Sequence, residues 1–277
     1  MESNLYKPMG RLERMASYVI ILLSATLSAV FFCLFNRLHV HGWRNFKRRK
    51  NTLLLPNHRT MIDSFLVGLL GCFPEAIWRP DLMPYHTAAA ENFFSSWLLA
   101  FFARMWRSIP IKPGRKDPTA LRITNEIIAD GVVMMFPEGT RSRDGTIGEG
   151  RLGVGRLILD TKPQTVPVFV AGMDKVLPIG SRIPRIGKRI DVYFGRPVDL
   201  SPYLTRNPSR ETTQQAVDRV ISELRLLEKI HYSGMAISWT HRMRARLMAV
   251  WCLAVDLAKV LFSVPRQLAR VFCWSKS

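Results

Sequence analysis

Apolar positions along the chain alternate between short continuous runs and longer amphipathic stretches. Short apolar runs bounded by turn residues predict buried strands. The predicted strands cover residues 38–42, 53–55, 108–111, 132–136, 165–170 and 189–194. Helical patterns lie between or after them, over residues 60–70, 118–130 and 209–230. This alternation predicts an α/β fold with a mostly parallel central sheet flanked by helices on both faces.

Local residues refine this prediction. Asp117 followed by Pro118 predicts a helix start, and Gly131 predicts its end. Pro167 cannot donate to a strand ladder, so we expect it at an edge or a bulge. The alternating polar and apolar residues of 189–194 also indicate an edge strand. The run from Phe93 to Trp106 is apolar on all sides. It fits either a core helix or an apolar surface, as the wall of a groove for an acyl chain or as a patch dipping into a bilayer.

The N-terminal part contains 18 residues without a charge, from Tyr18 to Phe35. As a helix this stretch would be roughly 27 Å long, close to the hydrocarbon thickness of a bilayer. Bulky Phe31 and Phe32 near its end argue against a signal-peptide cleavage site. We therefore expect a membrane segment, spanning or re-entrant. The basic residues after it outnumber those before it, which predicts that the following domain lies on the cytoplasmic side.

The C-terminal part has a different character. Residues 247–264 are apolar apart from Asp256 and Lys259, and arginines precede them. Two charges make a spanning helix unfavourable, so we expect a basic amphipathic helix at the membrane surface. A packed core helix and a dimer contact are the alternatives. The predicted organisation is an N-terminal membrane-anchoring segment at 1–37, one domain at 38–232 and a C-terminal membrane-associated helix at 233–277.

Composition favours a membrane over nucleic acid as the anionic partner. Forty Lys and Arg against 21 Asp and Glu give a formal net charge of +19, so an anionic surface should attract the protein. At 48% hydrophobic residues the chain is more apolar than a basic nucleic-acid binder usually is. We therefore expect membrane phospholipids and no nucleic acid as partners. The four cysteines show no metal-ligand spacing, and we predict no metal and no cofactor.

The stretch PNHRTMID, from Pro56 to Asp63, contains a candidate general base. A histidine can take a proton from a hydroxyl when a carboxylate holds its other ring nitrogen. Five residues along a helix turn about 140° net, so His58 and Asp63 cannot share one helical face. His58 is therefore expected in a turn before a helix that has Asp63 in its first turn. Thr60 is the expected N-cap of this helix. Alternatively, Asp63 only completes a capping box with Thr60.

The stretch FPEGTRS, from Phe136 to Ser142, follows directly on a predicted buried strand. It brings Glu138, Gly139, Thr140 and Arg141 to the strand end, where open α/β sheets place their ligands. Gly139 permits close backbone approach, and the Arg141 guanidinium suits a phosphate. The alternative is a solvated turn in which Arg141 pairs with Glu138.

Together these two stretches resemble the glycerolipid acyltransferases, the PlsC-like glycerol-3-phosphate and lysophosphatidic acid acyltransferase family. The NHxxxxD motif of that family matches Asn57, His58 and Asp63, and FPEGTRS matches throughout. VPVFV at 166–170 resembles the family's apolar proline-containing block. The second block, GxxFIxR, fits poorly because Arg107 occupies the glycine position and Pro113 the arginine position.

The resemblance implies a role for each matched residue. It implies His58 and Asp63 as catalytic residues, with Asp63 orienting His58. The residues it implies for substrate binding are Asn57, Glu138, Gly139, Thr140 and Arg141, with Lys112 or Arg115 supplying the charge missing from the second block. The implied reaction is acyl transfer from acyl-CoA or acyl carrier protein to the free hydroxyl of lysophosphatidic acid or a related lysophospholipid.

Two alternatives to this reaction stay open. Residues 87–94 and 153–178 are similar to tafazzin-type transacylases, which implies transfer from phospholipid to lysophospholipid without CoA. A non-catalytic basic membrane or nucleic-acid-binding protein would explain the charge but neither motif.

Overall fold

The computed structural model describes residues 9–73, 75–112, 117–142, 144–207 and 209–234. Its centre is a seven-stranded sheet in the order β1-β7-β6-β2-β5-β3-β4. The strands are β1 (Arg37–His41), β2 (Thr52–Pro56), β3 (Tyr85–Ala89), β4 (Ser108–Ile111), β5 (Val132–Met134), β6 (Gln164–Ala171) and β7 (Arg189–Phe194). Strands β6, β2, β5, β3 and β4 run parallel, whereas β7 is antiparallel to β6. The predicted mostly parallel sheet is confirmed.

Twelve helical segments lie within the described residues. They are α1 (Arg11–Ala29), η2 (Val30–Leu34), α2 (Asp63–Cys72), α3 (Glu75–Trp78), η3 (Pro80–Leu82), α4 (Ala90–Phe93), α5 (Trp97–Met105), α6 (Pro118–Ala129), α7 (Leu152–Thr161), α8 (Met173–Val176), α9 (Ser201–Leu204) and α10 (Arg210–Tyr232). The α6 prediction is confirmed, since the Asp117 side chain accepts from the Ala120 N–H.

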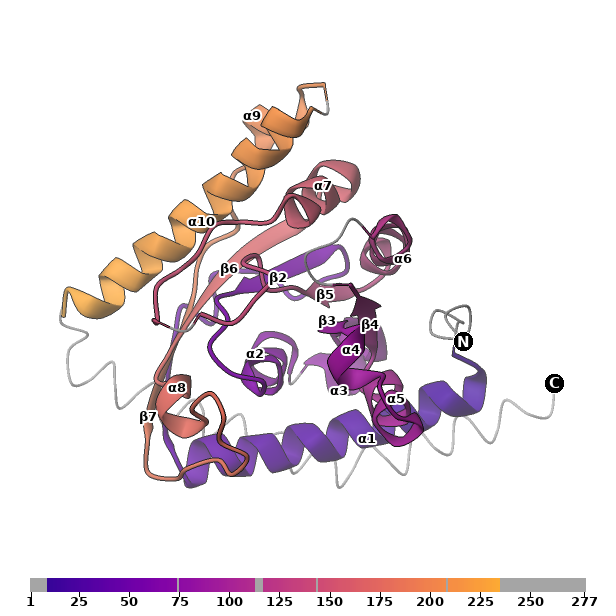
Figure 1. Ribbon diagram of the computed structural model, residues 1–277, viewed down its shortest axis with the longest axis vertical. Coiled ribbons are helices and arrows are strands. Elements are labelled where there is room, and N and C mark those ends of the chain that lie inside the picture. Colours follow the sequence, from indigo (N-terminus) through magenta and orange to yellow (C-terminus); the bar gives the residue numbers. More distant parts are fainter. Residues whose placement is uncertain (1–8, 74, 113–116, 143, 208, 235–277) are drawn as a thin grey trace.

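The alternation of side chains along β2 divides the core into two layers. Leu53 and Leu55 belong to one cluster, which includes Leu157 of α7 and Val217 of α10. Leu54 belongs to another, which is built with α1 and α2. Figure 1 shows α6, α7 and α10 on one side of the sheet and α1 and α2 on the other. Because both faces are covered, all five residues of β2 are buried.

Two edge predictions are wrong. Both β6, which contains Pro167, and β7 lie inside the sheet. Pro167 has no N–H to donate. The missing bond would run toward β7, but the pairing of β6 with β7 ends one residue short of it, at Val168 and Phe194. Beyond this pair the Pro167 carbonyl still accepts from the Gly195 N–H, so only one bond at the end of the ladder is lost. The polar residue of β7, Asp191, is 3% exposed and accepts two bonds from the Arg189 guanidinium.

The predicted N-terminal membrane segment is helical, and its 24 residues from Arg11 to Leu34 are long and apolar enough to cross a bilayer. One side of α1 is attached to the domain: the Ser17 hydroxyl donates to the Met105 carbonyl at 2.6 Å and Trp106 Nε1 donates to the Ser24 hydroxyl at 2.9 Å. The other side exposes apolar residues such as Leu23 and Leu27. Residues 1–8 of the predicted 1–37 unit and the predicted helix at 247–264 lie outside the described residues.

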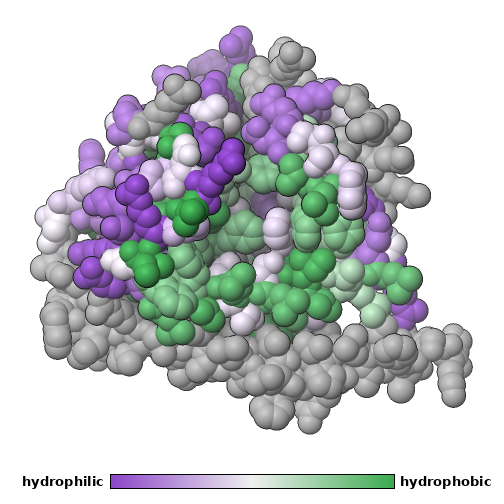
Figure 2. All heavy atoms as spheres, turned by 60° about the horizontal axis from the view of Figure 1, so that its bottom comes forward, coloured by the Kyte–Doolittle hydropathy of each residue, from purple (hydrophilic) through white to green (hydrophobic). Residues whose placement is uncertain are grey.

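The apolar run 93–106 forms the end of α4, α5 and the turn after it, and most of α5 is at the surface. Trp97 is 82% exposed, and Leu98, Leu99, Phe101 and Phe102 are also exposed. The core-helix interpretation is therefore wrong for α5, in which only Ala103 and Met105 are buried. Figure 2, which looks at the lower side of Figure 1, shows apolar residues gathered on that side of the molecule.

Candidate active site

The candidate site lies where the neighbouring strands β2 and β5 end. These strands are parallel, with Leu54 opposite Met134, so the residues that follow each strand meet at one edge of the sheet. His58 follows β2 by two residues and Glu138 follows β5 by four. The topology thus brings together the two motifs that lie far apart in the sequence.

His58 and Asp63 lie within contact distance of each other. Nδ1 of His58 is 3.2 Å from Oδ2 of Asp63, which is the first residue of α2 and is fully buried. A carboxylate at Nδ1 favours the tautomer with the proton on Nδ1, which leaves Nε2 with a lone pair to accept a proton. The His58 side chain is 18% exposed, so the site is accessible from one side.

Asp63 also organises the turn that precedes α2. Its Oδ2 accepts from the backbone N–H groups of Arg59 and Thr60 at 2.6 and 2.7 Å, and its Oδ1 accepts from the Thr60 hydroxyl at 2.6 Å. The contacts that the catalytic and the structural interpretations of Asp63 require are therefore both present. The prediction that Thr60 is the N-cap is wrong: α2 begins at Asp63 with Ile62 before it, because Thr60 donates its hydroxyl to Asp63 instead.

The first residues of FPEGTRS hold His58 in place. The Phe136 ring stacks on the His58 ring with 3.7 Å between centroids and 14° between planes. Oε1 of Glu138 accepts from the His58 backbone N–H, and Oε2 accepts from the Gly148 N–H, each at 2.9 Å. Glu138 is only 5% exposed. Its two oxygens thus fasten the turn that contains His58, and the substrate contact that the resemblance implies for Glu138 stays a prediction.

The later residues of the motif face solvent. Gly139, Thr140 and Arg141 are all exposed. Gly139 has φ +70°, a conformation that favours glycine. The alternative pairing of Arg141 with Glu138 is absent among the described residues, since Glu138 is buried against backbone N–H groups. Arg141 is therefore accessible to an anionic group from solvent.

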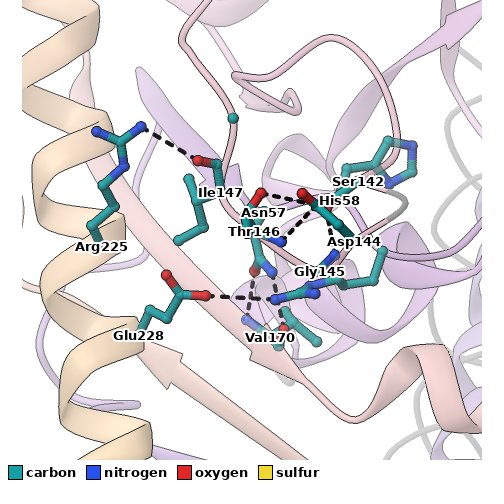
Figure 3. Close-up of polar contacts among 12 residues, drawn as sticks. Asn57, His58, Ser142, Asp144, Gly145, Thr146, Ile147, Val170, Arg225 and Glu228 are labelled. Carbon is teal, nitrogen blue, oxygen red and sulfur yellow. Dashed lines mark hydrogen bonds and ion pairs between the residues drawn. The ribbon is translucent and has the colours of Figure 1, made fainter.

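Asn57 connects the site to the next strand. Its Nδ2 donates to the Val170 carbonyl at 3.0 Å and its Oδ1 accepts from the Val170 N–H at 2.6 Å, and the residue is 1% exposed. Figure 3 shows this paired contact between Asn57 and Val170. The side chain therefore fixes the end of β2 against β6 rather than facing an open site.

The residues predicted to replace the missing charge of the second block lie further away. Lys112 is exposed and follows β4, the edge strand. Three strand spacings separate β4 from β2, roughly 14 Å, so Lys112 shares the edge with His58 without adjoining it. Arg115 lies outside the described residues.

The structure adds residues that sequence reasoning missed. Arg59, between two motif residues, is buried and its guanidinium lies 3.7 Å from the Glu228 carboxylate of α10. Arg225, also on α10, donates to the Ile147 carbonyl at 3.3 Å. Figure 3 shows Arg225 and Glu228 projecting from α10 toward the site. The apolar spacing of α10 predicts only a packing helix and gives no sign of these polar contacts.

Burial and charge act in opposite directions on Glu228. Burial raises the pKa of its carboxyl group, while the Arg59 and Arg225 guanidinium groups lower it and Glu138 raises it; the net effect is a raised pKa. Arg225 and Glu228 of α10 therefore interact electrostatically with Arg59 and Glu138, which come from the two motif stretches.

This combination of an open α/β sheet with a His–Asp pair at the carboxyl ends of its central strands is typical of proteins that activate a hydroxyl with a general base. Comparisons with known proteins indicate which family this site resembles. Residues 37–171 match the family model "Acyltransferase". Residues 37–171 therefore form a domain like that of the PlsC-like glycerolipid acyltransferases, the family whose motifs the sequence resembles.

The names of curated relatives agree with this likeness, and a solved structure shares the fold. A 1-acyl-sn-glycerol-3-phosphate acyltransferase of Limnanthes douglasii is 26% identical over 69% of this chain and 61% of its own length. A chloroplastic one of Arabidopsis thaliana is 25% identical over 53% of this chain and 39% of its own length. The chain thus spans less than two thirds of these relatives. The crystal structure of the lysophosphatidic acid acyltransferase PlsC of Thermotoga maritima shares the fold, with a TM-score of 0.57 and 21% identity over 82% of this chain and 86% of its own.

Proposed function

We propose that this protein is an O-acyltransferase that esterifies the free hydroxyl of lysophosphatidic acid or a related lysophospholipid. The observation that carries the proposal is the His58–Asp63 pair, with Nδ1 held at 3.2 Å and the ring stacked on Phe136. The names of the relatives support lysophosphatidic acid as the acceptor. The proposed acyl donor is acyl-CoA or acyl carrier protein, with no metal or other cofactor.

In this mechanism, Nε2 of His58 takes the proton of the acceptor hydroxyl as its oxygen attacks the acyl carbonyl carbon. The carbon–sulfur bond of the thioester breaks, the ester bond forms, and the proton passes to the leaving thiolate. Asp63 stabilises the imidazolium that forms in between. General-base assistance of this kind contributes roughly a hundredfold to ten-thousandfold.

The acceptor is held by groups at the entrance rather than by the buried ones. Exposed Arg141 offers a planar guanidinium to the acceptor phosphate, next to the backbone of Gly139 and Thr140. Buried Asn57 and Glu138 act by fixing the turn that contains His58. Binding energy from the phosphate then places the hydroxyl beside Nε2.

We also propose that the protein works at a membrane, with its acyl-transfer domain on the cytoplasmic side. The support is the exposed apolar side of α1 together with exposed Trp97, Phe101 and Phe102 of α5. Apolar area of this kind binds the interface between headgroups and acyl chains.

The test uses purified full-length protein in detergent with labelled acyl-CoA or acyl carrier protein and a panel of lysophospholipids. A parallel reaction contains labelled phospholipid as the donor and no CoA. We expect thioester-dependent product on lysophosphatidic acid, and loss of that product in His58→Gln. Transfer only from phospholipid would replace this proposal by the transacylase one, and full activity of folded His58→Gln would overturn the role of His58.

A further inference from the structure

Arg107 departs from the pattern of its family in a way that the backbone makes visible. It occupies the position where the family's second block has glycine, and its φ is +57°. A left-handed conformation suits glycine and is disfavoured for a residue with a side chain. The turn is nevertheless well bonded, because the Arg107 N–H donates to Arg104 and its carbonyl accepts from His86. A strained residue of this kind indicates that the side chain has a use.

The Arg107 side chain is buried without being fully satisfied. The residue is 8% exposed, and Nη1 donates to the carbonyls of Pro80 and Met83 at 3.0 and 3.3 Å. Its Nε has no hydrogen-bond partner among the described residues. The guanidinium also lies 5.2 Å from the centre of the Tyr85 ring. A buried guanidinium with an unused donor is a ready partner for an anion.

Arg107 lines a cavity of about 530 Å³ between α1 and the sheet. The other lining residues come from α1, the η3 region, the start of β3 and the end of α6: Arg11, Arg14, Met15, Tyr18, Val19, Pro80, Asp81, Tyr85, Glu126, Ile127, Asp130 and Gly131. Tyr85 begins β3, and Gly131 immediately precedes β5. The cavity therefore opens at the amino ends of these strands, on the opposite edge of the sheet from His58.

The charged residues that line the cavity leave it with unneutralised positive charge. Its three acidic lining residues are each paired with a cation outside the lining: Asp81 with Arg79, Glu126 with Arg122 and Asp130 with Lys50. Arg14 has no ion pair with an acidic residue in the described part of the chain. Burial, first of all, lowers the pKa of Arg107, and the nearby charge of Arg14 lowers it further while Tyr85 and Asp81 raise it. An anion between the two guanidinium groups would relieve their repulsion.

The remaining lining is apolar, which excludes a simple inorganic anion as the best fit. Met15 and Val19 of α1 line it together with Ile127 and Pro80, and its volume is in the range of small-molecule sites. We propose that this cavity is a second lipid-binding site that takes an anionic phospholipid, with its phosphate at Arg14 and Arg107 and an acyl chain along Met15, Val19 and Ile127. The site is separate from the catalytic one and does not depend on acyl transfer.

The test is photo-crosslinking of the full-length protein in detergent with a phosphatidic acid that has a photoreactive acyl chain. Labelled positions are mapped by peptide mass spectrometry. The variants are Arg107→Gly, which restores the residue that the left-handed turn prefers, and Arg14→Gln, which removes an arginine that pairs with no acid among the described residues. Arg219→Gln, a charge change on the distant α10, is the matched control. Thermal unfolding confirms that each variant is folded.

We expect labelling of the first half of α1 and of residues 80–85 in the wild type and in Arg219→Gln. Labelling should fall at least tenfold in Arg107→Gly and in Arg14→Gln, and with phosphatidylcholine as the probe. Unchanged labelling in both variants, or equal labelling by phosphatidylcholine, would overturn the site. Displacement of the lipid by millimolar inorganic phosphate would show that a phosphate ion is the ligand and would overturn the lipid assignment.

Discussion

The role of Glu138 is the point at which the structure and the family resemblance differ most, so Glu138→Gln is the sharpest test of the site. Each Glu138 oxygen accepts one backbone N–H at 2.9 Å, from His58 and from Gly148. Glutamine keeps one oxygen but presents an NH₂ group to the second N–H. One charge-assisted bond is weakened and one buried N–H is left unpaired. Together these changes should lower the free energy of unfolding by about 2–4 kcal/mol.

A loss of about 3 kcal/mol lowers Tm by about 6–12 °C in a protein of this size. The His58 backbone also loses its anchor, and a displacement of the base by about 1 Å lowers kcat about a hundredfold. Glu149→Gln is the matched control, because Glu149 is exposed and follows Gly148 directly. It should leave both Tm and kcat unchanged.

Arg141→Gln should raise KM and leave Tm unchanged, whereas Glu138→Gln should lower both Tm and kcat. Arg141 is exposed, so its removal should change stability by less than about 0.5 kcal/mol. Loss of a charge-assisted bond to the acceptor phosphate should raise KM for lysophosphatidic acid about ten- to a hundredfold. The assays are thermal unfolding followed by tryptophan fluorescence, and initial rates over a range of acceptor concentrations.

A Glu138→Gln protein with wild-type Tm and only a raised KM would refute the positioning role of Glu138.

Three further predictions concern the base, a buried histidine and two glycines. His58→Gln should lower kcat by about a hundredfold or more with Tm unchanged, whereas Asp63→Ala should also lower stability, by about 1–3 kcal/mol for each backbone N–H left unpaired; equal Tm values for the two variants would contradict this. Burial lowers the pKa of His86 from 6.5 to about 4, so the imidazole binds a proton more tightly in the unfolded state than in the folded one. The contribution of His86 to the free energy of unfolding should therefore be fully present above about pH 6.5 and should fall by about 3 kcal/mol as the pH drops to about 4. Urea unfolding at several pH values should show a smaller fall in His86→Gln than in the wild type. Gly155→Ala should destabilise the protein because a Cβ there would collide with the Thr213 carbonyl of α10, whereas Gly153→Ala meets nothing and should stabilise α7 by about 0.5–1 kcal/mol; identical Tm changes would contradict the packing argument.

Local signals predicted most of the individual elements. The apolar run at Leu53–Leu55 indicated a strand, and Asp117, Pro118 and Gly131 marked the ends of α6 correctly. These predictions succeed because hydrophobic period and helix capping act over a few residues. The prediction that Asp63 lies in the first turn of a helix is confirmed, but the helix was expected to begin at Thr60. Thr60 instead donates its hydroxyl to the Asp63 carboxylate, and this bond has the same residue spacing as a capping box.

Strand order and burial needed the tertiary structure. Pro167 and the polar residues of β7 indicated edge strands, yet both strands are interior. Proline and polar residues usually indicate an edge strand, and two features make them acceptable here. The hydrogen bond that Pro167 cannot donate would lie beyond the end of β7. The buried Asp191 carboxylate accepts a hydrogen bond from the Arg189 guanidinium. No pattern within either strand reveals which strand lies beside it.

The chemistry predicted for the site comes from the amino-acid sequence alone: a histidine, an aspartate five residues later, and a distant FPEGTRS motif are enough to predict a general base and a phosphate-binding arginine. Tertiary contacts then separate the residues that face the site from those that support it. Glu138 and Asn57 turn inward to backbone groups, Phe136 stacks on His58, and Arg141 faces solvent. This division arises because a residue's type sets what it can bond, whereas its burial and its neighbours across the sheet set what it does bond.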